Sequence, residues 1–343
     1  MTEILKINID SPECEKIEAA AQIIKHGGLV AIPTETVYGL GADATDEYAA
    51  KKIYAAKGRP SDNPLIIHIA HPEDAEKYAY TNELYYKLAK AFMPGPLTVI
   101  LPKKDIIPSS VTGGLDSVAI RCPSHPIASA IIEASGTAIA APSANLSGSP
   151  SPTCAEHVIQ DMNGRIDMII DGGNCDIGLE STIVKITDNS ALLLRPGAIT
   201  YDALCCVCDK VDIASAVTEQ LAQNERPLSP GMKYRHYAPR ARLVLLDGES
   251  SDVLKYMKNA QNSENCAIIC YDEDSLALNP KNLIPIGAQD DLELQAKSLF
   301  AALRASDDFN VDVIYAHLPS KDGIGLALYN RMIRAAAHTI KKV

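Results

Sequence analysis

The sequence predicts an α/β protein, with an N-terminal twisted mixed sheet and helices followed by a smaller C-terminal Rossmann-like parallel α/β domain. Three observations support this fold class. Short apolar runs typical of strands are mixed with stretches of helical spacing. Polar motifs rich in Gly and Pro lie directly beside the apolar runs. Near the end of the chain, strands and helices alternate. We expect domains at 1–200 and 241–343, with a linker or lid at 201–240.

The N-terminal half begins with an amphipathic helix pattern at 17–26, which Gly27 and Gly28 end. Many short strands mixed with helices indicate a twisted, mixed sheet. Further helices are expected at 47–57, 84–92 and 127–135, and strands at 29–32, 65–69, 97–101, 118–121, 138–141, 168–171, 181–186 and 191–195.

The C-terminal half begins with helical spacing at 201–217, followed by a Pro-containing linker at 224–240. The pair Gly323 and Gly325 marks the start of the last helix, whose apolar residues recur at i, i+3, i+4 and i+7. These are Tyr329, Met332, Ile333 and Ala336. Strands are expected at 243–246, 266–271, 283–286 and 311–315, and helices at 253–258, 292–305 and 326–341.

Composition limits the classes of function. The chain has 343 residues, a net charge of −11, no Trp and 3 Phe. An acidic balance argues against broad nucleic-acid binding, and few aromatic side chains argue against a base-stacking surface. We expect no signal peptide, no membrane span and a cytoplasmic protein with reduced thiols. Cys205, Cys206 and Cys208 have no partner pair with zinc-like spacing, so we expect no protein metal site.

Two cations at the end of a predicted helix form the first candidate site. Lys57 and Arg59 lie two residues apart, and Pro60 fixes the turn that follows. Lys supplies a point charge and Arg a planar fork, so together they can bind phosphate or carboxylate oxygens. Lys57 can instead be a solvated helix end that favours the helix dipole.

A loop of hydroxyl and amide side chains forms the second candidate. Ser143, Asn145 and Ser147 follow the small-residue strand at 138–141. Small side chains let a ligand approach the backbone closely, and the polar side chains can then bind an oxyanion. An ordinary Ser or Asx turn is the alternative interpretation.

Buried polar residues within predicted strands form the third candidate. His68 lies in an apolar strand, Arg121 ends another, and Ser181 begins a third. A strand His is usually a satisfied core residue. A buried Arg must be paired, and a substrate carboxylate could pair with it. The chain has no Walker loop, no Gly-x-Gly-x-x-Gly fingerprint and no nucleophile elbow, so positioning and charge neutralisation are the expected chemistry.

The motifs together resemble the YrdC/Sua5 family, in its long Sua5-type form, over almost the whole chain. The expected fold is therefore a YrdC-like catalytic domain with a Sua5 C-terminal domain. The matching segments are 33–41, 57–65, 94–98, 118–123, 142–148, 178–182, 195–197 and 229–239.

The resemblance implies a nucleotidyltransferase. L-threonine, bicarbonate and ATP with Mg²⁺ would give threonylcarbamoyl-AMP and pyrophosphate. A separate complex would transfer the threonylcarbamoyl group to adenosine 37 of tRNA. Lys57 and Arg59 would be catalytic. ATP would meet Lys57, Arg59, Ser61, Ser117, Ala141, Ser143, Asn145, Ser151, Arg195 and the linker residue Tyr234. Threonine would meet Thr34, His68, Arg121 and Ser181.

Two alternatives remain open at this point. The family's concave basic surface could bind double-stranded RNA, either as the main role or as a weak additional contact. Another carbamoyl-adenylate chemistry, as in hydrogenase-maturation carbamoyltransferases, is the second alternative. Those proteins carry zinc-finger-like and acylphosphatase-like parts, which this sequence does not show.

Overall fold

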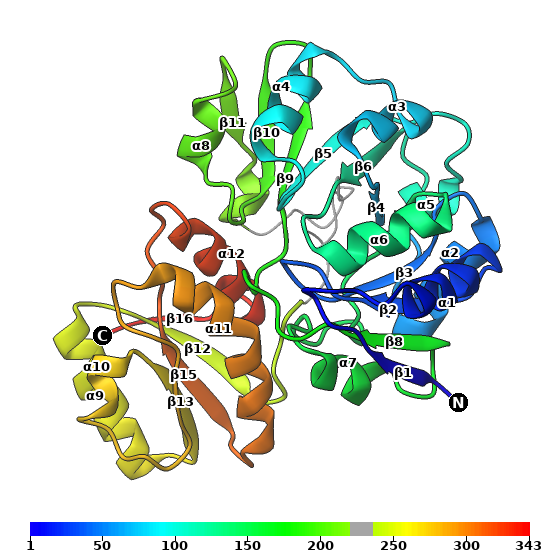
Figure 1. Cartoon of the computed structure of the whole chain (residues 1–343). Helices are drawn as coiled ribbons and strands as arrows, with labels where there is room; N and C mark the ends of the chain where they lie inside the picture. The colour runs from blue at the N-terminus through cyan, green and yellow to red at the C-terminus, as the bar shows by residue number, and fades with distance from the viewer. Residues whose placement is uncertain (220–235) are drawn as a thin grey trace. The chain divides into compact units, whose positions relative to one another are not determined.

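The computed structural model describes residues 1–219 and 236–343, which form two compact units (Figure 1). Unit 1 comprises the described parts of Met1–Ser147, Ser151–Asp176 and Glu180–Lys233. Unit 2 comprises those of Gly148–Pro150, Ile177–Leu179 and Tyr234–Val343. In these described ranges, no helix is both long and apolar enough to cross a membrane.

Unit 1 contains a large mixed sheet, in the order β1-β8-β2-β3-β7-β4-β6-β5-β9-β10-β11. Parallel and antiparallel pairs both occur: β4 pairs with β6 in parallel, and β6 pairs with β5 antiparallel. The strands are β1 Glu3–Lys6, β2 Val30–Ile32, β3 Gly39–Asp43, β4 Ile66–His68, β5 Leu97–Pro102, β6 Ser117–Arg121, β7 Ile139–Ala140, β8 Met168–Asp171, β9 Thr182–Ile186, β10 Ala191–Arg195 and β11 Val211–Ile213.

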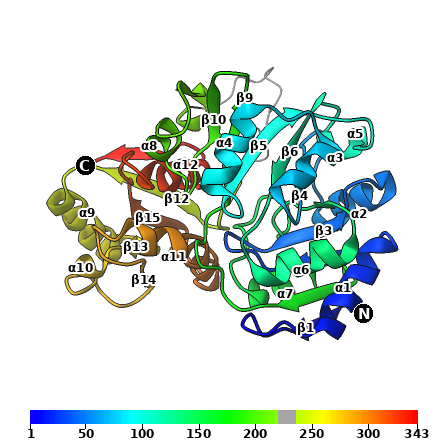
Figure 2. The same cartoon turned by 45° about the horizontal axis from the view of Figure 1, so that its top comes forward.

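The helices of unit 1 pack their apolar faces on this sheet. Ile17, Ile24 and Ile131 from α1 and α6 share one buried cluster with Val30 and Ile170 from β2 and β8; both figures show these helices close together (Figures 1 and 2). The helical segments are α1 Cys14–Lys25, α2 Glu47–Lys57, η1 Pro72–Asp74, α3 Ala75–Tyr78, α4 Glu83–Phe92, α5 Ser109–Thr112, α6 Pro126–Ser135, α7 Ala155–Met162, α8 Tyr201–Cys205 and η2 Ser215–Val217.

Unit 2 contains a parallel sheet in the order β14-β13-β15-β12-β16, and each pair of neighbouring strands is parallel. The alternation of strand and helix therefore gives the expected Rossmann-like architecture. Its elements are β12 Arg242–Asp247, α9 Ser250–Ser263, β13 Cys266–Cys270, α10 Asp272–Ser275, β14 Leu283–Pro285, α11 Leu292–Ala305, η3 Ser306–Asp308, β15 Val313–His317, α12 Gly325–Ala335 and β16 Ile340–Lys342.

Two expected helices are shorter than predicted. The segment 201–217 is helical only at α8, and it continues as β11 and η2. The expected helix at 326–341 ends with α12 at Ala335, and β16 follows. Ala337 and His338 have φ of 47° and 61°, and this left-handed backbone ends the helix. Helical spacing carried no signal for either of these short strands.

The strand β3 was also missed, because its Gly-rich sequence is atypical of strands. A Cβ on Gly41 would lie 2.8 Å from Ile139 Cγ2, so the close approach of β3 to that side chain requires glycine. The motif 33–41 is therefore a turn followed by a strand, and this places Thr34, Glu35 and Thr36 in the loop between β2 and β3.

Candidate functional site

A row of side chains runs across the middle strands of unit 1. His68 on β4 pairs with Arg121 on β6, and Arg121 pairs with Thr98 on β5. Thr98 pairs in turn with Ile183 on β9, which pairs with Arg195 on β10. Residues opposite each other on adjacent strands lie on the same face of a sheet. The register therefore brings together three predicted site residues that are far apart in the sequence.

Arg121 is the centre of this row and is 4% exposed. Its Nη1 donates to Thr36 Oγ1 at 2.8 Å, and its Nε donates to the Gly95 carbonyl at 3.4 Å. Its Nη2 lies 2.8 Å from Glu35 Oε1 in a buried ion pair. A buried Arg needs such a partner, since an unpaired charge is costly to bury. The Arg121 partner in this structure is therefore Glu35, a residue that sequence reasoning did not single out.

The polar groups around Arg121 are not fully satisfied. Both Glu35 carboxylate oxygens, Arg121 Nη2 and His68 Nδ1 are buried without a hydrogen bond of good geometry. Such groups are uncommon in folded proteins and often mark functional sites. Polar atoms of this region therefore remain available for a ligand.

Burial and neighbouring charges set the protonation of this region. Burial raises the pKa of Glu35, whereas the Arg121 charge and nearby hydrogen-bond donors lower it. The lowering effects are larger together, so the pKa of Glu35 lies below its usual range. Burial and the Arg121 charge lower the pKa of His68 to about 3. Near neutral pH, Glu35 is therefore an anion and His68 is uncharged.

Ser181 and Thr34 join the same network. The Ser181 hydroxyl lies 2.7 Å from Thr98 Oγ1, and Arg195 donates to the Ser181 hydroxyl and carbonyl at 3.1 and 3.0 Å. Thr34 Oγ1 lies 2.9 Å from Thr36 Oγ1, which accepts from Arg121. The four residues expected to bind threonine therefore lie in one connected region.

Lys57 forms a second centre at the end of α2. Gly58 caps the helix in the left-handed conformation, at φ 62°, and Lys57 is 2% exposed. Its ammonium donates to the carbonyl oxygens of Ser143 and Asn145, and the Ser147 amide donates to the Lys57 carbonyl at 2.9 Å. Lys57 therefore contacts the Ser143–Asn145 loop, next to which the sequence analysis expected it to bind ATP. Its hydrogen bonds also hold this loop in place.

The structure does not link all of the remaining predicted ATP contacts to these two centres. Arg59 donates to the Pro64 carbonyl at 3.1 Å, and the Ala141 amide donates to the Ile66 carbonyl at 2.9 Å. Ser117 begins β6, opposite Pro102. Ser61 is exposed in the turn after Arg59, and Tyr234 lies outside the described residues.

Ser151 shows a second partner that the sequence did not predict. Its hydroxyl donates to Glu180 Oε1 at 2.6 Å, and both residues are buried. Glu180 precedes Ser181, so this bond ties the loop after the Ser/Asn segment to the start of β9. Thr36, Thr98 and Glu180 all fall inside motifs that the sequence analysis singled out, and their adjacency to those candidates was the available signal.

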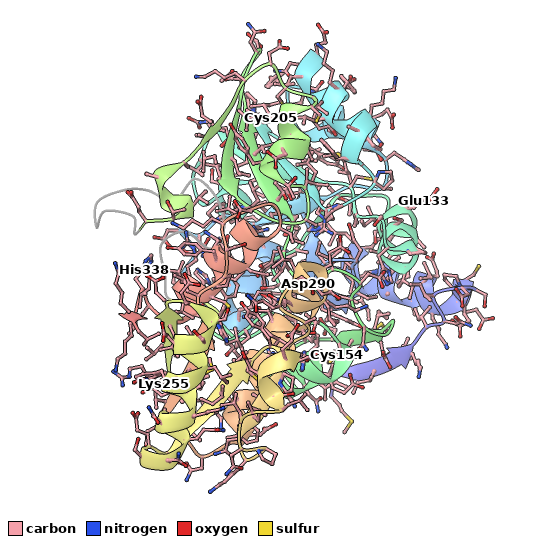
Figure 3. All side chains as sticks on the ribbon, turned by 90° about the vertical axis from the view of Figure 1, so that its left-hand side faces the viewer. Glu133, Cys154, Cys205, Lys255, Asp290 and His338 are labelled. Atoms are coloured by element: carbon pink, nitrogen blue, oxygen red, sulfur yellow. The ribbon has the colours of Figure 1, made fainter. Side chains whose placement is uncertain are left out.

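No cluster of His, Cys, Asp and Glu suited to a metal occurs in residues 1–219 and 236–343. The thiols are free, and Figure 3 places Cys205 and Cys154 on separate elements, α8 and the start of α7. Cys154 and Cys205 therefore do not form a shared cluster of thiol ligands of the kind that binds zinc.

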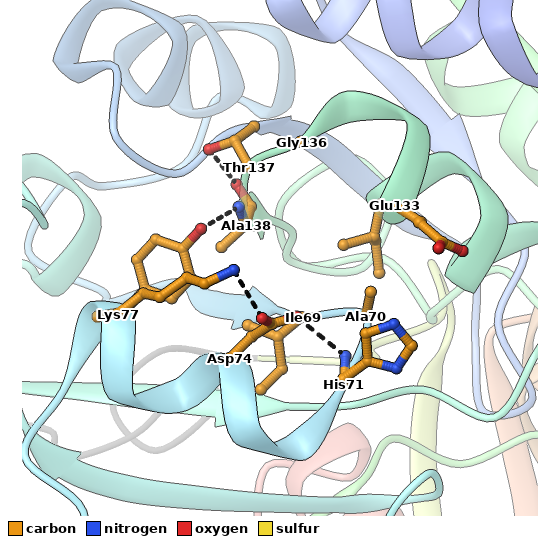
Figure 4. A pocket seen from close by; sticks show the side chains of 11 residues that line it. Ile69, Ala70, His71, Asp74, Lys77, Glu133, Gly136, Thr137 and Ala138 are labelled. Atoms are coloured by element: carbon orange, nitrogen blue, oxygen red, sulfur yellow. Dashed lines mark hydrogen bonds and ion pairs between the residues drawn. The ribbon is translucent and has the colours of Figure 1, made fainter.

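A separate pocket of about 220 Å³ lies between the end of β4, α3 and α6 (Figure 4). It is lined by Ile69, His71 and Glu133, and by an Asp74–Lys77 ion pair of 2.7 Å. No residue of the predicted site lines it, so it does not belong to the polar row.

Two family models match the chain. Residues 22–197 match the Sua5/YciO/YrdC family model, described as telomere recombination. Residues 199–337 match a model described as the threonylcarbamoyl-AMP synthase C-terminal domain.

Two relatives of similar length are both named threonylcarbamoyl-AMP synthase. Threonylcarbamoyl-AMP synthase of Pyrococcus abyssi is 45% identical and covers 96% of each chain. That of Bacillus subtilis is also 45% identical, over 94% of this chain and 93% of the relative. The crystal structure of P. abyssi Sua5 complexed with L-threonine is 44% identical, covers 100% of both chains and has a TM-score of 0.93. The chain therefore belongs to the Sua5/YciO/YrdC family, in its two-domain form with the threonylcarbamoyl-AMP synthase C-terminal domain.

Proposed function

We propose that unit 1 synthesises threonylcarbamoyl-AMP and pyrophosphate from L-threonine, bicarbonate and MgATP. The threonine ammonium and bicarbonate condense to a carbamate, releasing water and a proton. A carbamate oxygen then attacks the α-phosphorus of ATP, and the bond from that phosphorus to the β-phosphate bridging oxygen breaks. Both reactants are anionic, so the residues must bring like charges together.

The amino acid binds in the Arg121 region under this proposal. The Arg121 fork faces the threonine carboxylate, and Thr34, His68 and Ser181 surround it. The observation that carries this assignment is the buried Arg121 guanidinium, whose Nη2 has no hydrogen bond of good geometry although Glu35 Oε1 lies 2.8 Å away. A carboxylate oxygen is the natural acceptor for that N–H group. Neutral His68 adds a hydrogen-bonding group without adding charge.

The nucleotide binds at the Lys57 end. Lys57 and Arg59 offset the negative charge of the phosphates, and the Ser143–Asn145 loop surrounds them. The Lys57 ammonium donates to the carbonyl oxygens of Ser143 and Asn145, and these bonds hold it beside the loop. Ser61, Ser117, Ala141, Ser151, Arg195 and Tyr234 complete the proposed contacts. Mg²⁺ enters as its complex with ATP.

The biological setting is part of the same proposal. The protein acts in the cytoplasm, and its product is an activated acyl-adenylate-like compound. A separate transferase complex consumes it and modifies adenosine 37 of tRNA. The family relationship supports this placement.

Omission of single substrates tests the proposal. Pyrophosphate release should require L-threonine, bicarbonate and ATP together, and mass spectrometry should detect threonylcarbamoyl-AMP in equal amount. Pyrophosphate release that is independent of threonine or bicarbonate would contradict the reaction. Arg165→Gln, at an exposed position of unit 1, serves as a control with unchanged rates.

A further inference from the structure

Glu35 is a buried charged residue to which neither the sequence motifs nor the proposed reaction assigns a role. It is 6% exposed, and its Oε1 lies 2.8 Å from Arg121 Nη2. Arg121 and the backbone N–H groups of Glu35 and Ser124 lie close enough to the carboxylate to lower its pKa, yet neither oxygen receives a hydrogen bond of good geometry. A carboxylate that serves only stability is normally satisfied by donors when it is buried. The position of Glu35 therefore calls for a functional explanation.

The guanidinium of Arg121 is held from three sides. Gly95 accepts from Nε, Thr36 accepts from Nη1, and Glu35 attracts Nη2. These contacts fix the plane of the fork before a ligand arrives. Preorganisation of this kind reduces the cost of ordering the side chain on binding. It also leaves an Nη2 donor direction for the ligand.

The same pair controls the local charge. Glu35 cancels the charge of Arg121, and neighbouring His68 and His125 both have pKa values lowered chiefly by burial, so they add no charge near neutral pH. Coulomb attraction grows with the charge of the ligand, so a phosphate dianion depends more on uncancelled positive charge than a zwitterionic amino acid does.

We propose that Glu35 is a positioning and specificity-determining residue, which orients Arg121 toward an amino-acid carboxylate and keeps phosphate groups away from Arg121. This inference rests on the proposed function, since it assigns the Arg121 region to the amino acid. Glu35 does not touch the reacting atoms and acts through Arg121. Its two effects, orientation and charge cancellation, can be separated by substitution.

Glu35→Gln removes the charge and keeps the size, whereas Glu35→Asp keeps the charge and shortens the side chain. For Glu35→Gln we expect KM for L-threonine to rise at least about tenfold, because Arg121 loses its partner. The Ki of inorganic phosphate, measured in competition with threonine, should fall about tenfold. KM for ATP should change less than about threefold. Glu35→Asp should raise KM for threonine but leave phosphate inhibition at the wild-type level.

Glu133→Gln, at an exposed position of α6, is the matched control and should leave all three parameters unchanged. Unchanged threonine KM and phosphate Ki in Glu35→Gln would overturn the inference. Equal losses for threonine and ATP would also overturn it, because they would show a general structural defect. If Glu35→Gln does not fold, Glu35→Asp decides: a raised threonine KM with wild-type phosphate inhibition supports the inference, and a wild-type threonine KM contradicts it.

Calorimetric titration of L-threonine, with and without inorganic phosphate, makes the test independent of turnover. A wild-type chain that binds threonine without releasing pyrophosphate would refute the proposed function. In that case the Glu35→Gln titration still tests the inference: weaker threonine binding with stronger phosphate competition supports it, and binding equal to the wild type contradicts it.

Discussion

Each of the two units contains a buried acid–base pair beside the end of a central strand, and the two pairs differ in how completely their polar atoms are hydrogen-bonded. In unit 1, Arg121 ends β6 and lies 2.8 Å from Glu35. In unit 2, His317 ends β15 and lies 2.7 Å from Asp274, which follows β13. Several polar atoms around Arg121 lack hydrogen bonds of good geometry, whereas no buried atom of Asp274 or His317 does.

The residues around the Asp274–His317 pair also leave little room for a ligand. The Tyr271 ring stacks on His317 with centroids 4.3 Å apart, and the adjoining cavity of about 10 Å³ has room for about one water molecule. Neighbouring side chains therefore cover the Asp274–His317 pair. The comparison supports the ligand site that we propose at Arg121 and a stabilising role for the Asp274–His317 pair.

Loss of Arg121 should have the largest effect on activity. Arg121→Gln removes the fork that we assign to the amino-acid carboxylate, so kcat/KM for threonine should fall about 10²–10³-fold in pyrophosphate-release assays. Arg165→Gln should retain the wild-type value. Wild-type kinetics in Arg121→Gln would show that the amino acid binds elsewhere. The Arg121–Glu35 pair would then have no role in binding that distinguishes it from the Asp274–His317 pair.

Loss of Lys57 should reduce activity about 10²-fold, mainly through ATP. Lys57→Met keeps an aliphatic stem but releases the Ser143 and Asn145 carbonyl oxygens and removes one positive charge. Steady-state kinetics with varied ATP measure the effect. Lys51 lies on the same helix and its side chain is exposed. The control variant Lys51→Met should therefore change neither kcat nor KM for ATP. A defect confined to threonine KM would contradict the assignment of this end to the phosphates.

Disruption of the unit 2 pair should affect stability rather than catalysis. His317→Gln removes a hydrogen bond to a buried carboxylate, so the free energy of unfolding should fall by about 1.5–3 kcal/mol. Urea unfolding monitored by tyrosine fluorescence measures this loss. The kcat per folded molecule should remain within about twofold of the wild type. A large loss of kcat without a loss of stability would show that the comparison assigns the wrong role to this pair.

Acidification by one pH unit should produce the smallest effect, through His68. Its pKa is about 3 in the folded chain, against an ordinary value of 6.5. Between these values the unfolded chain binds a proton that the folded chain does not. The free energy of unfolding should therefore fall as pH decreases from about 6.5 toward 3, by about 1.4 kcal/mol per pH unit from this group.

The variant His68→Gln isolates this contribution. Glu35 and His125 also have lowered pKa values and act in the same direction, so the wild-type slope contains their effects. The unfolding free energy of His68→Gln should depend less steeply on pH than that of the wild type. Equal slopes in both proteins would show that His68 titrates normally in the folded state.

The sequence predicted the fold class and most elements of the sheet, because apolar runs bounded by Gly and Pro report burial directly. The strand at 168–171 is a clear case, since β8 has the same bounds. Short strands such as β11 and β16 could not be predicted, because each depends on a neighbouring strand rather than on its own pattern.

The candidate site was less accessible from the sequence. Motif residues such as Arg121 and Lys57 could be chosen by type and position, but their partners could not. The register of β4, β6 and β5 brings His68, Arg121 and Thr98 together, and a one-residue shift would move a strand's side chains to the other face. The Glu35–Arg121 ion pair joins residues 86 positions apart, so only the fold reveals it.

A crystal structure of this chain with L-threonine and a non-hydrolysable ATP analogue tests the central claim most directly. The account predicts the threonine carboxylate within hydrogen-bond distance of Arg121 Nη2 and the phosphates beside Lys57 and Arg59. Threonine bound beside Lys57, with phosphate oxygens on Arg121, would contradict it.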